Sequence, residues 1–359
     1  MTEYTYNVHG IFSLKSNTTY FEGMLHAFKT DKERRSALNF EFRMDPDLRI
    51  SREGKERINI MFYHDPVDNS IEVDYPWVRP ICAKLVFSDE ERNCLFLFNG
   101  NYMKASRLVG GCWRLISIMR ALLQMNLIRS NMILVHGGVV RIGGQGILIP
   151  GVENTGKTTT VWSLAKNGAQ FVTDEYSIFD EDGQSYGIPG NSSLTKTTAR
   201  AIGLKFRRSE RVLLTLADIK GKVLTIHLSS GATSVPPERF FKTCDKTLVS
   251  ASTIIQNGVD STKRIGFEEA LAKIKAIQLF EFGWRNHPFL LAYSFFNPTF
   301  DLTRLYSRED DILASVLTKI QRFYLVSSSK RDHNKAIESI AKTHVEQYLS
   351  YSQGQPIDS

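Results

Sequence analysis

The chain has 359 residues, of which 42% are hydrophobic and 23% are charged, and its formal net charge is +7. This length allows two domains, and the composition is that of a folded globular protein. The basic residues form no arginine-rich arm, which argues against nucleic-acid binding, and the longest hydrophobic stretch, 112–128, contains charged residues and is too short to span a bilayer. The N-terminus lacks the basic start and apolar core of a secretory signal. We therefore expect a cytoplasmic protein that binds neither membranes nor nucleic acids.

Residues 1–105 are expected to form a first module that is rich in strands. Strands are predicted at 4–11, 58–63 and 94–98, where hydrophobic residues alternate or run together next to turn residues. No pattern in this module indicates a catalytic or ligand-binding role.

A helix and three strands are predicted next along the chain. Hydrophobic residues at helical spacing predict the helix over 107–129. Short hydrophobic runs predict strands at 132–135, 139–142 and 146–149, and Gly143-Gly144-Gln145 predicts a hairpin turn between the last two.

The strand at 146–149 leads into the sequence GVENTGKT, residues 151–158, which fits the phosphate-binding pattern G-x-x-x-x-G-K-[ST] without a mismatch. The two glycines let backbone N–H groups turn toward an anion, and the helix expected over 158–167 points the positive end of its dipole at the same place. Lys157 would reach the outer phosphates, and Thr158 offers a hydroxyl to Mg²⁺. The residues assigned to nucleotide binding are Gly151, Asn154, Thr155, Gly156, Lys157, Thr158 and Thr159.

Two adjacent acids follow the next predicted strand, at 170–173. Only one helix and one strand therefore separate Lys157 from Asp174 and Glu175. A strand, loop, helix and strand of this length form a compact cradle, in which an acidic pair can meet the metal that Thr158 also binds.

The sequence VHGGV at 135–139, the loop at 151–158 and Thr173-Asp174-Glu175 follow one another much as they do in the HPr kinase family, which this part of the chain resembles. The resemblance covers about 130–190 and continues weakly to about 345, without reaching the first module. It implies an α/β fold with the P-loop core that HPr kinases share with phosphoenolpyruvate carboxykinases. This core would span 106–348, after a smaller β-rich domain at 1–105 and before a polar tail at 349–359.

The resemblance also implies roles for individual residues. Asp174 would be the general base that takes the proton from the acceptor hydroxyl, and Glu175 would hold Mg²⁺ together with Thr158. His136 would position the phosphates, and Lys157 would neutralise charge on the transferring group. The implied cofactors are ATP and Mg²⁺.

One signature of the family is not recognisable in this chain. The segment 186–196 stands where the family has a leucine- and glycine-rich motif with a glutamate and an arginine. The protein HPr as substrate, and the reverse phosphorolysis that some members perform, are therefore left open. The polar segment 191–200 and the basic cluster at 205–211 would either clamp the acceptor or phosphate, or form a solvated loop.

Three further helices are predicted at 267–280, 310–323 and 335–348, and we expect them to cover the sheet. The expected reaction is transfer of the terminal phosphate of ATP to a serine or threonine hydroxyl of a protein or peptide, such as a lasso-peptide precursor. Two alternatives remain. The first is an enzyme that acts on a small molecule, either a kinase, for example for free serine, or a carboxykinase-like enzyme. The second is a regulator that senses nucleotide without turnover. The sequence leaves open whether the chain is a monomer or a homo-oligomer.

Overall fold

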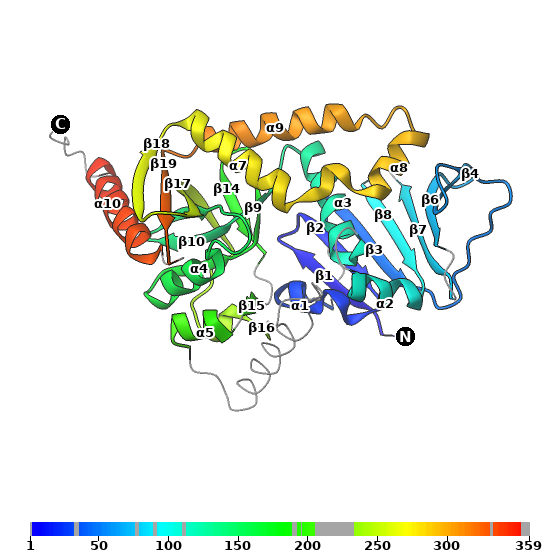
Figure 1. The fold of residues 1–359 in the computed structure, drawn as a ribbon, viewed down its shortest axis with the longest axis horizontal. Helices are drawn as coiled ribbons and strands as arrows, with labels where there is room; N and C mark the ends of the chain where they lie inside the picture. The colour runs from blue at the N-terminus through cyan, green and yellow to red at the C-terminus, as the bar shows by residue number, and fades with distance from the viewer. Residues whose placement is uncertain are drawn as a thin grey trace. The chain divides into compact units, whose positions relative to one another are not determined.

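The computed structural model has the mixed α/β content that the sequence predicts (Figure 1). Its contacts divide the chain into two compact units, and among the described residues the first contains 2–130 and 283–308 and the second 131–282 and 309–352. The basic cluster at 205–211 and the end of the polar tail lie outside the described residues. The structure describes residues 2–31, 36–75, 79–88, 92–109, 113–188, 192–194, 196–204, 233–330 and 333–352.

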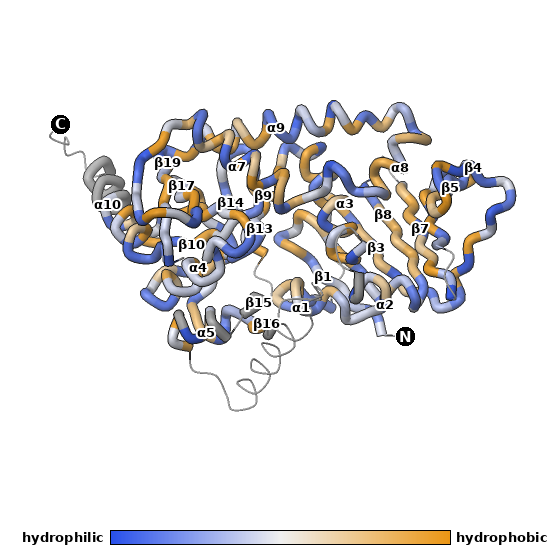
Figure 2. Tube along the Cα trace, viewed as in Figure 1, coloured by the Kyte–Doolittle hydropathy of each residue, from blue (hydrophilic) through white to orange (hydrophobic). Residues whose placement is uncertain are grey.

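The first unit is built on one mixed sheet, with the strand order β1-β2-β3-β8-β7-β6-β5-β4. The pairs β2–β3 and β3–β8 are parallel, and the other neighbouring strands are antiparallel. Figure 2 shows β7 and β8 mostly in the colour of hydrophobic residues, as expected for strands in a core. The strands are β1 (Tyr4–Val8), β2 (Phe12–Ser16), β3 (Leu38–Met44), β4 (Glu56–Arg57), β5 (Phe62–Asp65), β6 (Ser70–Tyr75), β7 (Ile81–Ser88) and β8 (Asn93–Phe98).

The strand predicted at 94–98 is confirmed by β8, and the one predicted at 4–11 is confirmed in part, because β1 ends at Val8 and a turn with positive φ at His9 and Gly10 follows. The strand predicted at 58–63 is wrong, because β5 begins only at Phe62. Asn59 Oδ1 accepts hydrogen bonds from the backbone N–H groups of Met61 at 2.8 Å and Phe62 at 2.9 Å. Such local bonding by an asparagine side chain stabilises a turn in place of a strand.

Two helices, α2 (Gly100–Val109) and α3 (Leu115–Arg129), take the place of the single helix predicted over 107–129. Tyr102 of α2 packs against Phe96 of the first sheet, with ring centroids 5.7 Å apart. These helices belong to the first unit, so the division lies after residue 130, whereas we expected a boundary near residue 105.

A later segment of the chain also belongs to the first unit. The helix α8 (Pro288–Phe296) places Phe289 against Phe62 and Phe96 of the sheet, with centroid distances of 5.4 and 5.3 Å. The domain expected to run without a break from 106 to 348 is therefore interrupted at 283–308.

The second unit is organised around a mixed sheet in which β17 is the central strand. The order is β12-β10-β11-β17-β14-β13-β9, and β19 pairs with both β17 and β18. β17 is parallel to β11 and β19 and antiparallel to β14. The strands are β9 (Ile133–His136), β10 (Gly138–Ile142), β11 (Gln145–Ile149), β12 (Gln170–Thr173), β13 (Tyr176–Phe179), β14 (Gln184–Gly187), β17 (Lys246–Asn257), β18 (Ser261–Ile265) and β19 (Arg322–Ser328), with a separate pair β15 (Ser192–Leu194) and β16 (Thr233–Val235).

The predicted hairpin before the loop 151–156 is confirmed. β10 and β11 pair antiparallel with Ile142 opposite Gln145, and Gly143 and Gly144 between them have φ values of 56° and 86°. Two residues with positive φ match the twist of the flanking strands, which explains the two glycines.

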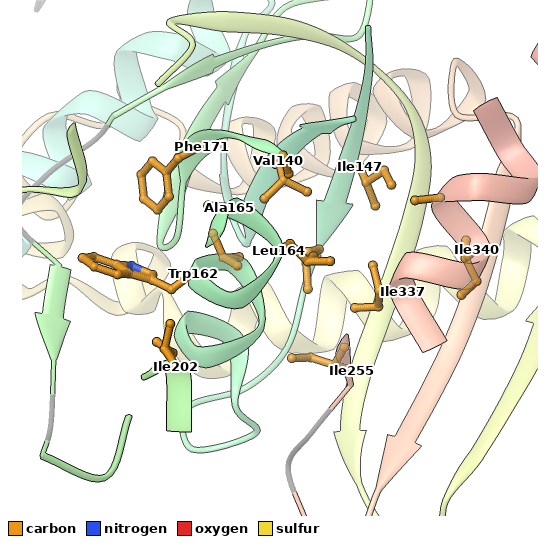
Figure 3. Close-up of a cluster of buried hydrophobic side chains, with 14 of the residues drawn as sticks. Val140, Ile147, Trp162, Leu164, Ala165, Phe171, Ile202, Ile255, Ile337 and Ile340 are labelled. Atoms are coloured by element: carbon orange, nitrogen blue, oxygen red, sulfur yellow. The ribbon is translucent and has the colours of Figure 1, made fainter. Parts of the chain in front are cut away.

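The helix α4 (Lys157–Lys166) packs against the sheet and against the helix α10 (Asn334–Ser352) (Figure 3). Its buried side chains share one hydrophobic cluster with residues of the sheet and of α10. This close packing fixes the position of α4 and therefore of its N-terminal end. The labelled members of this cluster in Figure 3 are Val140, Ile147, Trp162, Leu164, Ala165, Phe171, Ile202, Ile255, Ile337 and Ile340.

The helices predicted near the C-terminus are confirmed in two cases. α7 (Phe267–Glu281) and α10 match the predictions, although α10 continues to Ser352, into the expected tail. The helix predicted at 310–323 is partly wrong, because α9 (Leu302–Thr318) ends earlier and β19 begins at Arg322. None of the described helices combines the length and hydrophobicity that a membrane span requires. The remaining short helices are α1 (Glu22–Leu25), α5 (Lys196–Ile202) and the 3-10 turns at Thr19–Phe21, His26–Phe28, Pro237–Arg239 and Gly283–Asn286.

Candidate functional site

The loop 151–156 joins the end of β11 to the start of α4. Asn154 and Gly156 have positive φ values of 64° and 96°, and Gly156 is the residue directly before the helix. At Gly151 glycine is needed for space instead, because a Cβ there would lie 2.7 Å from Ile255 Cγ1. Thr155 closes the loop by donating its hydroxyl to Val152 O at 2.7 Å. Thr158 and Thr159 lie in the first turn of α4 and are half-buried.

Lys157 is the buried cation of this site. Its side chain folds back over the loop, where Nζ donates to Gly151 O at 2.9 Å and contacts His136 Nε2. Burial lowers the pKa of Lys157, and four carboxylates within electrostatic reach oppose this shift without cancelling it. In order of decreasing effect, they belong to Glu175, Glu281, Asp174 and Glu153.

The lowered pKa of Lys157 predicts a pH dependence of stability. Because the pKa in the folded state is below the ordinary value of 10.5, the unfolded chain binds more protons between the two values, and the free energy of unfolding rises with pH in this range. The destabilisation is complete below the folded-state pKa and is relieved as the pH rises toward 10.5. In the Lys157→Met variant the side chain at this position does not titrate, so its contribution to the rise of the free energy of unfolding with pH should be lost. In urea denaturation from roughly pH 7 to 10, the stability of the wild type relative to the variant should increase with pH, and a constant difference would contradict the assignment.

His136 is held in place at the end of β9. Its backbone N–H donates to Gln278 Oε1 at 2.6 Å, and Gln278 Nε2 donates to Leu134 O at 2.8 Å. The imidazole ring meets the ring of Tyr176 edge-on, with centroids 4.8 Å apart. Gln278 of α7 thus fixes the strand end that carries His136, a role that nothing in the sequence pattern indicated.

Replacing Gln278 by alanine should lower the free energy of unfolding by about 1–3 kcal/mol, because two buried backbone groups of β9 lose their partners. Urea denaturation measures this change. The matched control is Leu279→Ala, next to it on α7 and exposed, which should stay within about 0.5 kcal/mol of the wild type. Equal effects of the two variants would contradict this role of Gln278.

Asp174 and Glu175 lie at the bend between β12 and β13. Asp174 is 8% exposed, and its Oδ2 accepts a hydrogen bond from Trp162 Nε1 of α4 at 3.3 Å, whereas Glu175 is exposed. Gly137 N donates to Glu175 O at 2.9 Å, which ties this bend to the residue after His136. In the structure His136 contacts Lys157, and the carboxylates of both predicted acids lie within electrostatic reach of the Lys157 amine.

Two residues of this site come from distant parts of the chain and were missed by the sequence analysis. Glu281, the last residue of α7, accepts a hydrogen bond from the backbone N–H of Glu153 at 2.5 Å. His333, which precedes α10 and is fully buried, donates from Nε2 to Thr155 O at 2.9 Å. These pairs are 128 and 178 residues apart in the chain, so no local motif could have predicted them.

The acids of this site do not form a closed metal cage. Within the part of the chain that the structure describes, no group of three or more His, Cys, Asp or Glu residues is arranged to hold a metal ion. Of the polar segment at 191–200, the described residues form β15 and the start of α5, and the basic cluster that follows it is not described.

The sequence matches no protein-family model, and no curated protein matches it.

Proposed function

We propose that this protein is an ATP-dependent kinase with an HPr kinase-like P-loop core, which transfers the terminal phosphate of ATP to a serine or threonine hydroxyl of a protein or peptide. One observation carries the proposal: Lys157, at the start of α4, is buried against the loop 151–156 within electrostatic reach of Asp174 and Glu175. Phosphoryl transfer relies on positioning and on charge neutralisation, and these residue types supply both.

The loop and the first turn of α4 fit the phosphates of a nucleotide. Positive φ at Asn154 and Gly156 curls the backbone in the way that makes anion-binding concavities. The N–H groups of the first helical turn have no partners within the helix and carry partial positive charge. Lys157, whose buried charge is unfavourable, would gain an anionic partner in the outer phosphates.

The acids nearby also fit the expected metal. Mg²⁺ commonly takes only one or two carboxylates from a protein and completes its shell with phosphate and water, so a closed cage is not required. Thr158 and Glu175 would hold the ion. When bound, it would neutralise negative charge on the phosphates.

Asp174 would act as the general base. Its largely buried carboxylate is oriented by Trp162, and it would take the proton from the acceptor hydroxyl. The hydroxyl oxygen forms the new bond to the terminal phosphorus, and the bond from that phosphorus to the bridging oxygen of ADP breaks. Lys157 and His136, which touch one another, would hold the transferring group. We expect this reaction to take place in the cytoplasm.

A screen of acceptors tests the proposal. The purified protein is incubated with ATP and Mg²⁺ and with serine- and threonine-containing peptides or free serine, and the products are analysed by mass spectrometry. A phosphorylated peptide is the expected result. Phosphorylation of free serine alone would contradict the peptide substrate, and ATP binding without transfer to any acceptor would contradict a kinase.

A further inference from the structure

Glu281 contacts the loop 151–156 and approaches His136, and neither the pattern of the loop nor the acidic pair explains this. Its Oε1 accepts from the backbone N–H of Glu153 at 2.5 Å, and its Oε2 lies 4.0 Å from His136 Nε2. The side chain is only 12% exposed, so the carboxylate is turned toward the loop and away from solvent.

The groups that Glu281 contacts are those that the proposed phosphates would use. Glu153 contributes one of the backbone N–H groups of the loop, and His136 contacts the amine of Lys157. A carboxylate and a phosphate are both anions that accept hydrogen bonds from such donors. Both cannot accept a strong bond from the same N–H group, and two negative charges a few ångströms apart repel strongly in a partly buried site.

We propose that Glu281 is a further residue of the phosphate site, which occupies the Glu153 N–H group and lies beside Nε2 of His136 in competition with a phosphate. This inference rests on the proposed function, since it takes the loop 151–156 to be a phosphate site. A bound phosphate displaces the carboxylate, and the affinity for nucleotide is set partly by this displacement.

The position of Glu281 allows its side chain to leave the loop at a small cost in conformational free energy. It is the last residue of α7, and Phe282 after it already has non-helical backbone angles. The preceding residues Leu279 and Phe280 are 57% and 78% exposed, so this end of the helix borders solvent that can take up a displaced carboxylate. The helix itself does not have to unwind.

Glu281→Gln removes the negative charge and keeps the shape of the side chain. Competition predicts that this variant binds phosphate-containing ligands about tenfold more tightly or better, because the repulsion is gone and a neutral amide is a weaker acceptor. Glu281→Ala, which also removes the acceptor, should tighten binding in the same direction. A residue that held the metal or only positioned the loop would instead weaken binding, or leave it unchanged, when replaced.

Isothermal titration calorimetry with ADP in the absence of Mg²⁺, and with inorganic pyrophosphate, tests this inference. The matched control is Glu268→Gln, the same change at an exposed position in the first turn of α7, and circular dichroism shows whether each variant is folded. Tighter binding by folded Glu281→Gln or Glu281→Ala, with Glu268→Gln unchanged, supports competition. Equal or weaker binding by both Glu281 variants, with the wild type binding, overturns the competition and leaves the proposed function standing. Binding by none of the proteins overturns the phosphate site and this inference together.

Discussion

Replacing Lys157 by alanine is expected to lower kcat/KM for phosphate transfer by about a thousandfold or more, which corresponds to roughly 4 kcal/mol of barrier. The amine is buried against the loop and contacts His136, so its charge at the proposed phosphate site is largely shielded from water. A charge in such a site stabilises the transition state far more than an exposed charge does. Steady-state kinetics with the acceptor identified by mass spectrometry measure the loss.

The control for this variant is Lys166→Ala, at the other end of α4, where the side chain is exposed and donates to Ile202 O at 2.6 Å. It should keep its kcat/KM within a few-fold of the wild type. Activity of Lys157→Ala near that of Lys166→Ala would show that the loop does not hold the reacting phosphate.

Replacing Asp174 by asparagine should lower kcat by about a thousandfold or more and leave nucleotide affinity nearly unchanged. An amide cannot take the proton of the acceptor hydroxyl, but its Oδ1 can still accept the hydrogen bond from Trp162 Nε1, so the local structure should persist. Single-turnover kinetics measure the chemical step, and calorimetry with an ATP analogue measures the affinity.

An exposed aspartate provides the comparison for this second variant. Asp182 lies in the turn between β13 and β14, and Asp182→Asn should retain full activity. If Asp174→Asn turns over as fast as Asp182→Asn, Asp174 is not the general base. If it binds nucleotide far more weakly than the wild type, its main role lies in binding.

Local sequence was sufficient to predict the helices and strands next to the loop 151–156. The hairpin at Gly143 and Gly144, the helix α4 and the strand β12 each carry their own turn, spacing or hydrophobic signal. Prediction from local sequence failed where a single side chain or the pairing with a distant segment determines the secondary structure. Asn59 converts the start of a hydrophobic run into a turn, and Arg322 begins a strand that is paired along its whole length with β17, a long-range contact that overrides the local helical pattern.

The residues of the candidate site also differ in how far local sequence could predict them. His136 ends β9, Lys157 begins α4 after the loop that follows β11, and Asp174 follows β12, all in one continuous stretch of chain. The proximity of Lys157 and Asp174 could be expected from their spacing, and that of His136 from the resemblance to HPr kinases. Glu281, at the end of α7, and His333, just before α10, reach the loop from segments that lie much later in the chain. Their approach depends on how α7 and α10 pack, which residue spacing does not encode.

A crystal structure of the protein with a non-hydrolysable ATP analogue and Mg²⁺ tests the central claim most directly. We predict that the β- and γ-phosphates lie in the loop 151–156 against Lys157 Nζ, with the metal between Thr158 and Glu175 and with Glu281 turned away from the Glu153 N–H group. A nucleotide bound elsewhere, or bound at the loop with Asp174 and Glu175 out of reach of the phosphates and the metal, would contradict it.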